Sequence, residues 1–214
     1  MQFTATISTS LLVIVLATMA SASTIVDVKR DIITIDASIV NLYQHLQAPS
    51  PNAFTAFAAH QASNHLIADI RAGSTCISQL TEKPTDADAK LMLTTLGKTE
   101  TKAKAVVNKM IAYYPKVTEM GGLKMATNTV LELQSQVKTF SEQLVRLAPM
   151  EEMGAAKQLG ARFNADLTLC ADVYTGKTSP EAAAKSNGGL AYNTEAGTTN
   201  VADQATTDAT AQQA

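Results

Sequence analysis

The sequence has little of what several common functions require. Its 214 residues include no Trp and two Cys, and only 17% are charged, with a net charge of −2. Without an excess of basic residues the chain offers no electrostatic footprint for a phosphate backbone, so we exclude nucleic acid as a partner. A membrane-spanning helix needs about 20 apolar residues in succession, and the longest apolar run here is much shorter. We therefore expect no transmembrane span.

Motifs of catalysis and metal binding are also missing. The sequence contains no HExxH, GxSxG or CxxC pattern, each of which places nucleophiles, bases or ligands at a fixed spacing. Two of the three histidines, His60 and His65, fall on one predicted helix. A separation of five residues turns them about 140° apart, so they do not converge on one ion. We predict no enzymatic activity, no metal site, no catalytic residues and no cofactor.

Residues 1–22 have the features of a secretory signal. An apolar stretch from Leu11 to Leu16 precedes Ala20-Ser21-Ala22, the small-x-small pattern that signal peptidase cuts. We predict cleavage after Ala22 and a secreted protein that is extracellular or held in the cell wall. Lys29-Arg30 resembles a dibasic processing site with cleavage after Arg30, or it is an ordinary charged face of the first helix.

The mature chain is dominated by helical periodicity. In residues 123–147 the apolar positions follow steps of three and four without a slip, and they are Leu123, Ala126, Val130, Leu133, Val137, Phe140, Leu144 and Leu147. The same spacing recurs over residues 25–46. This period is typical of an amphipathic helix and not of a strand, so the fold class is all-α.

Three further helices are predicted between breakers. Their ranges are about 54–80, 86–114 and 150–174, and the breakers are rich in Pro and Gly. Thr85 or Asp86 is a suitable N-cap for the third helix, and Pro115 should end it. Because short connections make successive helices antiparallel, we predict an up-and-down bundle of about five long helices over residues 23–174.

Small residues occupy several inward positions of the second and fifth helices. On the second helix the predicted stripe begins Phe54, Ala58 and Ala62, and the fifth carries Ala156 and Gly160. Small side chains either let helices approach closely or leave an apolar gap between them. The sequence leaves both outcomes open.

The two cysteines pose a question of pairing. An even count in a secreted chain favours a disulfide. Cys76 and Cys170, however, both lie late in helices that should run in opposite directions. Disulfide Cα atoms must lie within about 7 Å, so we predict free thiols.

Residues 175–214 differ in composition from the rest. They are rich in Thr, Ala, Gly, Asn and Gln and have almost no large apolar side chains. Such a segment buries too little surface to offset the entropy of ordering, so we predict a disordered tail. Its Ser and Thr residues are either carriers of O-linked sugars or part of a plain linker.

The arrangement resembles a known family. The "KRDI-x-x-I" start, "AFAAHQASNHLIADIRAGST" and "VVNKMIAYYPKVTEMGGLKMATNTVLELQSQV" are similar to the fungal hydrophobic surface-binding proteins, which include cell wall galactomannoproteins. The resemblance implies a secreted, non-enzymatic protein that adsorbs to hydrophobic surfaces and recruits a polyester-degrading hydrolase there. It also implies binding of fatty acids or other lipids between the helices.

The apolar stripe and the small residues are therefore the candidate ligand-binding residues. They are Val130, Leu133, Val137, Phe140 and Leu144 of the fourth helix, with Ala58, Ala62, Ala156 and Gly160. The alternative is a structural cell-wall mannoprotein or colonisation factor, whose core is filled by its own side chains.

The first prediction concerns processing. We expect N-terminal sequencing of the protein from culture supernatant to begin at Ser23, or at Asp31 if the dibasic site is used. A supernatant protein that begins at Met1 would remove the argument for a cleaved signal.

Overall fold

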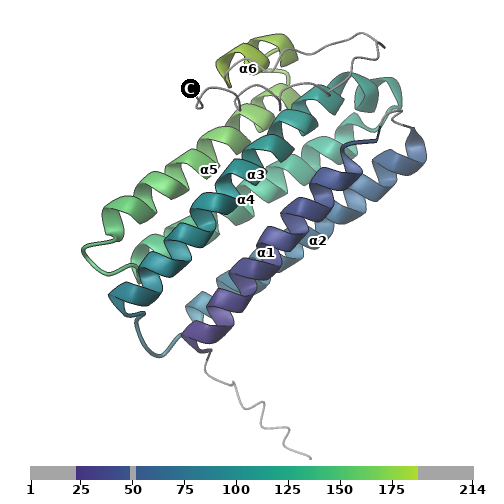
Figure 1. The fold of residues 1–214 in the computed structure, drawn as a ribbon. Coiled ribbons are helices and arrows are strands. Elements are labelled where there is room, and N and C mark those ends of the chain that lie inside the picture. The colour runs from purple at the N-terminus through teal and green to yellow at the C-terminus, as the bar shows by residue number, and fades with distance from the viewer. Residues whose placement is uncertain (1–22, 49–51, 188–214) are drawn as a thin grey trace, which may run out of the picture.

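Six helices contain most of the residues that the computed structural model describes, which are residues 23–48 and 52–187 (Figure 1). The five long helices are α1 (Ile25–His45), α2 (Ala53–Ser78), α3 (Asp86–Glu119), α4 (Leu123–Leu147) and α5 (Met153–Tyr174), and the short α6 is Pro180–Ser186. The one extended pairing in this part of the chain is a single bridge between Ser23 and Leu80. The predicted all-α bundle is confirmed.

The first three helices begin at capping boxes. The side chains of Thr24, Asn52 and Thr85 each accept a hydrogen bond from the backbone N–H three residues later, and the side chain of that later residue accepts one from the backbone N–H of the cap. Each box satisfies two of the N–H groups that a helix start leaves without partners. Thr85 is therefore the cap of α3, as its sequence position suggested.

The third helix is longer than predicted. It continues through Pro115 to Glu119, although a proline inside a helix removes one backbone hydrogen bond and costs about 3 kcal/mol. The segment beyond Pro115 contributes Val117, which packs against the core. Just before Pro115, Tyr113 is buried and donates to the carbonyl of Ala48, with 3.3 Å between the oxygens. Tertiary packing thus holds this helix through its proline.

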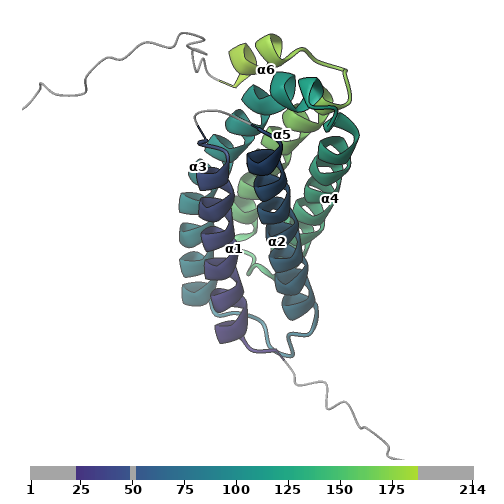
Figure 2. The same cartoon turned by 90° about the vertical axis from the view of Figure 1, so that its right-hand side faces the viewer.

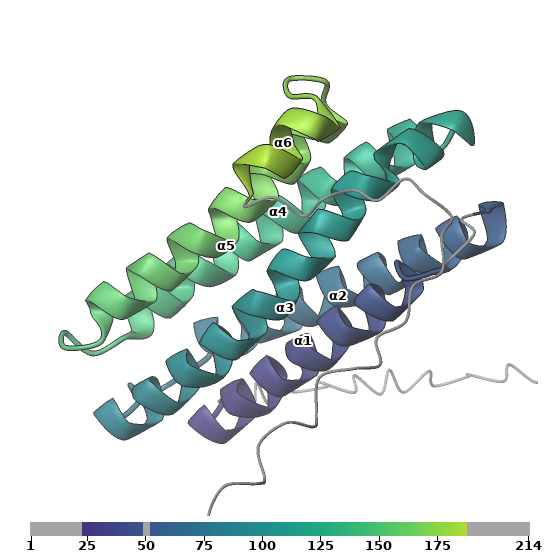
Figure 3. The same ribbon diagram turned by 45° about the horizontal axis from the view of Figure 1, so that its top comes forward.

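The five long helices form a ring, and Figure 2 shows part of it from the side, with α3 beside α1 and α4 beside α2. Going around it, α1 packs on α2, α2 on α4, α4 on α5, α5 on α3, and α3 on α1. Successive helices run antiparallel, as expected, but their order around the ring differs from their order in the chain (Figure 3). The α2–α3 and α3–α4 connections therefore cross the ends of the bundle, and α3 packs beside α1 and α5.

Each seam of the ring carries a polar link. The links are Ser38–Asp69 between α1 and α2, Arg71–Glu132 between α2 and α4, Gln134–Thr168 between α4 and α5, Arg162–Glu100 between α5 and α3, and Lys102–Asp36 between α3 and α1. Exposed pairs of this kind contribute little stability, about 0–1 kcal/mol each. Their value lies in fixing which residues of neighbouring helices face one another.

The buried face of α2 differs from the predicted stripe. Phe54 is 80% exposed, whereas Ala59, Ala62, Leu66 and Ile70 are buried. A helix turns about 100° per residue, so steps of four drift by about 40° each. Sixteen residues before Ile70, Phe54 lies about 160° around the helix. The stripe predicted with four-residue steps was therefore wrong at its beginning.

The first part of the predicted disordered tail is ordered, so the prediction was wrong there. Residues 180–186 form α6, capped by Ser179, and Ala183 is fully buried. Asn187 donates to Asn108 of α3 with 2.6 Å between the side-chain nitrogen and oxygen. The rest of the predicted tail, residues 188–214, and the predicted signal, including Ala22, lie outside the described residues.

Both cysteines are buried free thiols, as predicted. Cys76 lies near the end of α2 and Cys170 near the end of α5, at opposite ends of the bundle (Figure 1). Cys170 is completely buried, and burial raises its pKa to about 12. Burial also raises the pKa of Cys76.

The second prediction follows from these thiols. Because the thiolate is the reactive form, we expect both cysteines to resist alkylation at pH 8 in the folded protein and to react after unfolding. Intact mass under non-reducing conditions should equal that of the dithiol form. A deficit of two hydrogens together with resistance to alkylation after unfolding would contradict the antiparallel placement of α2 and α5.

Candidate ligand-binding site

A ring of five helices leaves space along its axis. With neighbouring axes about 9 Å apart, each axis lies about 8 Å from the centre, whereas a helix with its side chains has a radius of about 5–6 Å. A channel of roughly 2–3 Å in radius therefore remains unless large side chains fill it. Its filling depends on the side chains that the five stripes direct inward.

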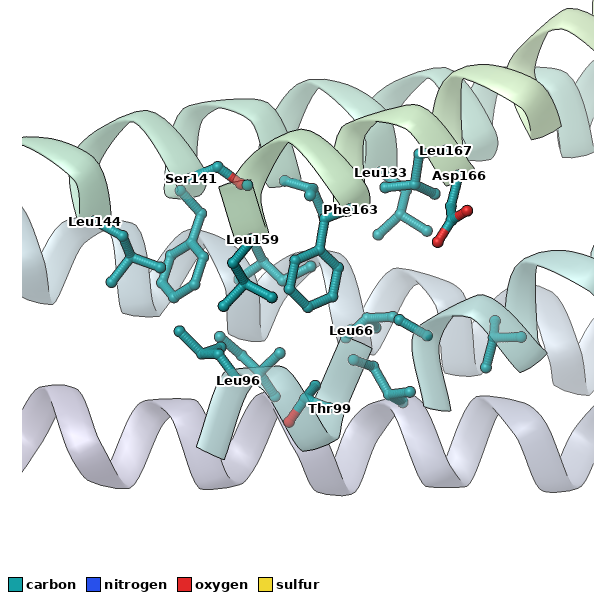
Figure 4. Close-up of a pocket in the computed structure, with 18 of the residues that line it drawn as sticks. Leu66, Leu96, Thr99, Leu133, Ser141, Leu144, Leu159, Phe163, Asp166 and Leu167 are labelled. Carbon is teal, nitrogen blue, oxygen red and sulfur yellow. The ribbon is translucent and has the colours of Figure 1, made fainter. Parts of the chain in front are cut away.

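The structure leaves part of this space open as a cavity of about 70 Å³. All five long helices contribute to its wall (Figure 4). Apart from Thr99, Ser141 and Asp166, the lining residues are apolar: Ile35, Ile39, Leu66, Ile70, Leu93, Leu96, Ala103, Val106, Val107, Leu133, Val137, Phe140, Leu144, Ala156, Leu159, Gly160, Phe163 and Leu167. We call this the central cavity.

Six of the nine candidate residues line the central cavity. They are Leu133, Val137, Phe140 and Leu144 of α4, with Ala156 and Gly160 of α5. These two helices pack against each other, so their stripes meet on one wall. Val130 is only 1% exposed, but it lies one turn before Leu133 on α4 and lines a second pocket.

The two α2 candidates do not reach the cavity. Ala62 is buried in the core but lines neither the central cavity nor the second pocket, and Ala58 is only partly buried. The buried residue of that turn is Ala59, which lines the second pocket. Ala58 lies about 120° from Ile70 around the helix and Ala59 only about 20°, which explains the difference.

Several lining residues were missed by the sequence analysis. From α3 they include Leu96, Ala103 and Val106, and from α5 Leu159 and Phe163. Both segments were predicted to be helical, and their apolar spacing is the signal that could have identified most of these residues. What the sequence lacked was the ring order, which places α3 against α5 and brings both stripes to the same cavity.

The small residues have two different roles. A Cβ atom at Gly160 would lie 3.1 Å from Cβ of Ser141, and one at Gly73 would lie 3.1 Å from Phe140. Both glycines therefore permit a close approach of neighbouring helices. Ala103 and Ala156 instead border open space. Both outcomes that the sequence left open occur, at different residues.

Three polar side chains lie among the lining residues of the central cavity. Thr99 turns its hydroxyl toward α1 (Figure 4), where it donates to Asp36 at 2.9 Å. Ser141 packs against Gly160. Asp166 points from α5 toward the gap between α5 and α3 (Figure 4). Burial raises the pKa of Asp166, and its effect outweighs the opposing attraction of Lys104, while Glu100 adds to the rise.

A second pocket, of about 250 Å³, lies toward the end of the bundle where α2 and α4 begin and α3 ends. Its wall includes Tyr113, Val130 and Tyr174, and its rim carries Phe57 and Met125, which are 53% and 44% exposed. His60 also lines this pocket and is hydrogen-bonded to Thr129, with 3.1 Å between Nδ1 and Oγ1. This hydrogen bond satisfies the imidazole of His60 in an otherwise apolar wall, so its presence there needs no catalytic role.

One cluster has the residue types of a catalytic triad but not its geometry. Ser38 donates to Asp69 directly, and Nδ1 of His65 lies 3.0 Å from the same carboxylate oxygen. In a triad the histidine stands between serine and aspartate and uses both ring nitrogens. Here Nδ1 of His65 faces both the Asp69 carboxylate and the Ser38 hydroxyl, which is 3.3 Å away, so the imidazole does not stand between them and the cluster is a polar link between α1 and α2.

The described part of the chain offers neither a cluster of metal-binding side chains nor a helix suited to span a membrane. Over residues 23–48 and 52–187, no three His, Cys, Asp or Glu side chains come together as a possible metal site. None of the helices in this part of the chain combines the length and hydropathy that crossing a membrane requires.

Solved structures with the same fold include lipid complexes. The complex of Afmp4p with palmitic acid aligns with a TM-score of 0.67 at 19% identity, over 71% of this chain and 99% of that one. Ligand binding domain 1 of the Penicillium marneffei MP1 protein, complexed with arachidonic acids, aligns with a TM-score of 0.65 at 14% identity, over 71% and 99%. At such identities the likeness shows the fold alone.

A comparison with curated protein sequences finds no significant match. The profile of one protein family does match, that of hydrophobic surface binding protein A, over residues 25–146. Since this match covers more than half of the 214 residues, the chain belongs to the hydrophobic surface binding protein A family.

Proposed function

We propose that this is a secreted, non-enzymatic protein that binds long-chain apolar ligands, fatty acids among them, in the central cavity. The observation that carries the proposal is the cavity itself, whose wall is apolar except for Thr99, Ser141 and Asp166. The palmitic and arachidonic acids held by proteins of the same fold support this ligand class. The apolar segment ending at Ala20-Ser21-Ala22 supports secretion to the medium or the cell wall.

The hydrophobic effect is large enough to drive such binding. Burying a chain of about 14 methylenes contributes roughly 11 kcal/mol at about 0.8 kcal/mol each. Association costs of about 4 kcal/mol or more must be subtracted. At most about 7 kcal/mol then remains, and micromolar affinity corresponds to about 8 kcal/mol, so the polar end of the ligand must contribute about 1 kcal/mol or more.

Ligand entry requires the cavity to widen. Its volume of about 70 Å³ is roughly half that of an engineered 150 Å³ cavity that accepts benzene. Leu93 and Ala103 of α3 and Phe163 and Asp166 of α5 are partly buried lining residues on adjacent helices. We propose that the ring opens along this α3–α5 seam, where lining side chains of both helices are only partly buried.

The alternative, a structural wall protein with a filled core, fits the cavity less well. A filled core has few voids larger than a water molecule, and the void here is several times that size. Adsorption to a hydrophobic surface, the role for which the family is named, would use the same stripe of α4 once the bundle opens. Recruitment of a secreted hydrolase to that surface remains a proposal from the family resemblance.

A cavity-filling variant tests ligand binding. Ala156→Leu places a larger side chain into the cavity wall at a residue that is 4% exposed. We expect the variant to stay folded, because the open space accommodates part of the added volume. Its affinity for dodecanoic acid and dodecan-1-ol should fall at least tenfold, measured by titration calorimetry on delipidated protein.

Ala165→Leu is the matched control, since Ala165 lies on the same helix and is exposed. It should bind both lipids like the wild type. A wild-type protein that binds neither lipid would overturn the proposed function. A folded Ala156→Leu variant with wild-type affinity would move the ligand out of the central cavity.

A charge on the α4 stripe tests its interior position. Phe140 is 6% exposed, and Phe140→Asp removes its packing, worth about 3–5 kcal/mol, and buries an unpaired carboxylate. We expect a lower melting temperature by circular dichroism and weaker lipid retention. We also expect less adsorption to hydrophobic beads below that melting temperature.

Thr139→Asp, at an exposed neighbouring residue, should change stability by no more than about 0.5 kcal/mol. If Phe140→Asp were as stable and as adsorptive as this control, the interior assignment of the stripe would fail. Adsorption would then be assigned to exposed apolar side chains such as Phe54 and Phe57.

A further inference from the structure

The central cavity has one ionisable lining residue, Asp166. It is partly buried on α5, between Phe163 and Leu167, which also line the cavity. Figure 4 shows its carboxylate directed into the space between α5 and α3, on the same side as Phe163. An ionisable group in this position would contact a ligand in the central cavity as well as the solvent.

No charged partner among the described residues neutralises this carboxylate by direct contact. Lys104 of α3 is near enough to attract it but forms no ion pair within 4 Å. Arg162, one turn earlier on α5, is directed instead to Glu100, with 3.8 Å between nitrogen and oxygen. Glu100 itself repels Asp166. The carboxylate therefore keeps unused capacity to accept hydrogen bonds at the edge of an apolar space.

We propose, on the basis of the function proposed above, that Asp166 selects the polar end of the bound ligand. It favours chains that end in a hydrogen-bond donor, such as a primary alcohol or a protonated fatty acid, over ionised fatty acids. The reason lies in how the Asp166 carboxylate interacts with the polar end of the ligand. An ionised carboxylate only accepts hydrogen bonds, and two carboxylates at one poorly solvated site disfavour each other's charge.

The position of Asp166 also orients the ligand. Ala156, near the start of α5, and Asp166 both line the cavity, and ten residues of helix separate them by about 15 Å. A polar end at Asp166 leaves the hydrocarbon chain to run from there toward Ala156 and Leu144. The apolar wall accordingly binds the hydrocarbon chain, and Asp166 contacts the polar end of the ligand.

Ser141 offers the competing arrangement. Its hydroxyl is a donor as well as an acceptor, and it lines the cavity on α4 against Gly160. A fatty-acid carboxylate bound there would lie about 9 Å along α5 from Asp166, counted from Gly160. The two arrangements predict opposite preferences for an ionised ligand, so one experiment separates them.

The test compares dodecan-1-ol with dodecanoate at pH 8, where the free acid is ionised. Titration calorimetry on delipidated full-length protein gives both dissociation constants for the wild type, Asp166→Asn and Ser141→Ala. We expect the wild type to prefer the alcohol at least tenfold. Asp166→Asn should strengthen dodecanoate binding about tenfold and change alcohol binding less than threefold, because the amide oxygen still accepts a hydrogen bond. Ser141→Ala should leave the preference for the alcohol over dodecanoate as it is in the wild type.

Asp172→Asn is the charge control, because Asp172 lies on the same helix and pairs with Lys177 at 3.4 Å, away from the lining residues of the cavity. It should behave like the wild type, and thermal melting should show that all variants fold. Equal binding of the two lipids by the wild type, or an unchanged preference in Asp166→Asn, would overturn the selection proposed for Asp166. So would a loss of dodecanoate binding in Ser141→Ala. Failure of both lipids to bind would overturn the proposed function as well.

Discussion

Everything in this structure follows from how five amphipathic helices bury their apolar stripes against one another. A ring of five cannot close its own axis with small side chains, because neighbouring helices keep each axis about 8 Å from the centre. Large residues such as Ile35, Leu66 and Phe140 narrow the axial space, while Ala103 and Ala156 leave it open. The central cavity is therefore a consequence of helix number combined with side-chain size.

The same constraint explains why polar links lie on the outside of the ring and apolar side chains on the inside. Polar links such as Arg71–Glu132 and Gln134–Thr168 lie outside and set which helix faces which. Of the residues that line the central cavity, only Thr99, Ser141 and Asp166 are polar, so most of its wall can hold a ligand only by hydrophobic burial. Asp166 departs from that pattern, and this departure gives the cavity a means of distinguishing one apolar chain from another.

The sequence predicts the stripe of α4 well because its steps of three and four average close to the helical period. Leu133, Val137, Phe140 and Leu144 therefore lie together on the cavity wall. The same reasoning failed on α2, where steps of four carry Phe54 to the far side of the helix. Periodicity is thus informative only when the steps themselves keep to the period of 3.6 residues.

Other features depend on contacts that no local pattern reports. The ring order requires knowing which connections cross the ends of the bundle, and α3 passes through Pro115 because its last turns gain tertiary packing. Helix α6 forms in a polar segment whose one buried side chain, Ala183, finds a place against the bundle. In the sequence, Asp166 has no feature that distinguishes it from a surface residue. Its position in the cavity wall depends on the packing of α3 against α5.

The most direct test of this account is a crystal structure of the protein with dodecan-1-ol bound. The account predicts continuous density for the chain between Leu133, Phe140 and Ala156, inside the ring, with its hydroxyl within hydrogen-bond distance of Asp166. It also predicts a wider α3–α5 seam than in the ligand-free protein. Density confined to the second pocket or to the outer surface, with the central cavity unchanged, would contradict it.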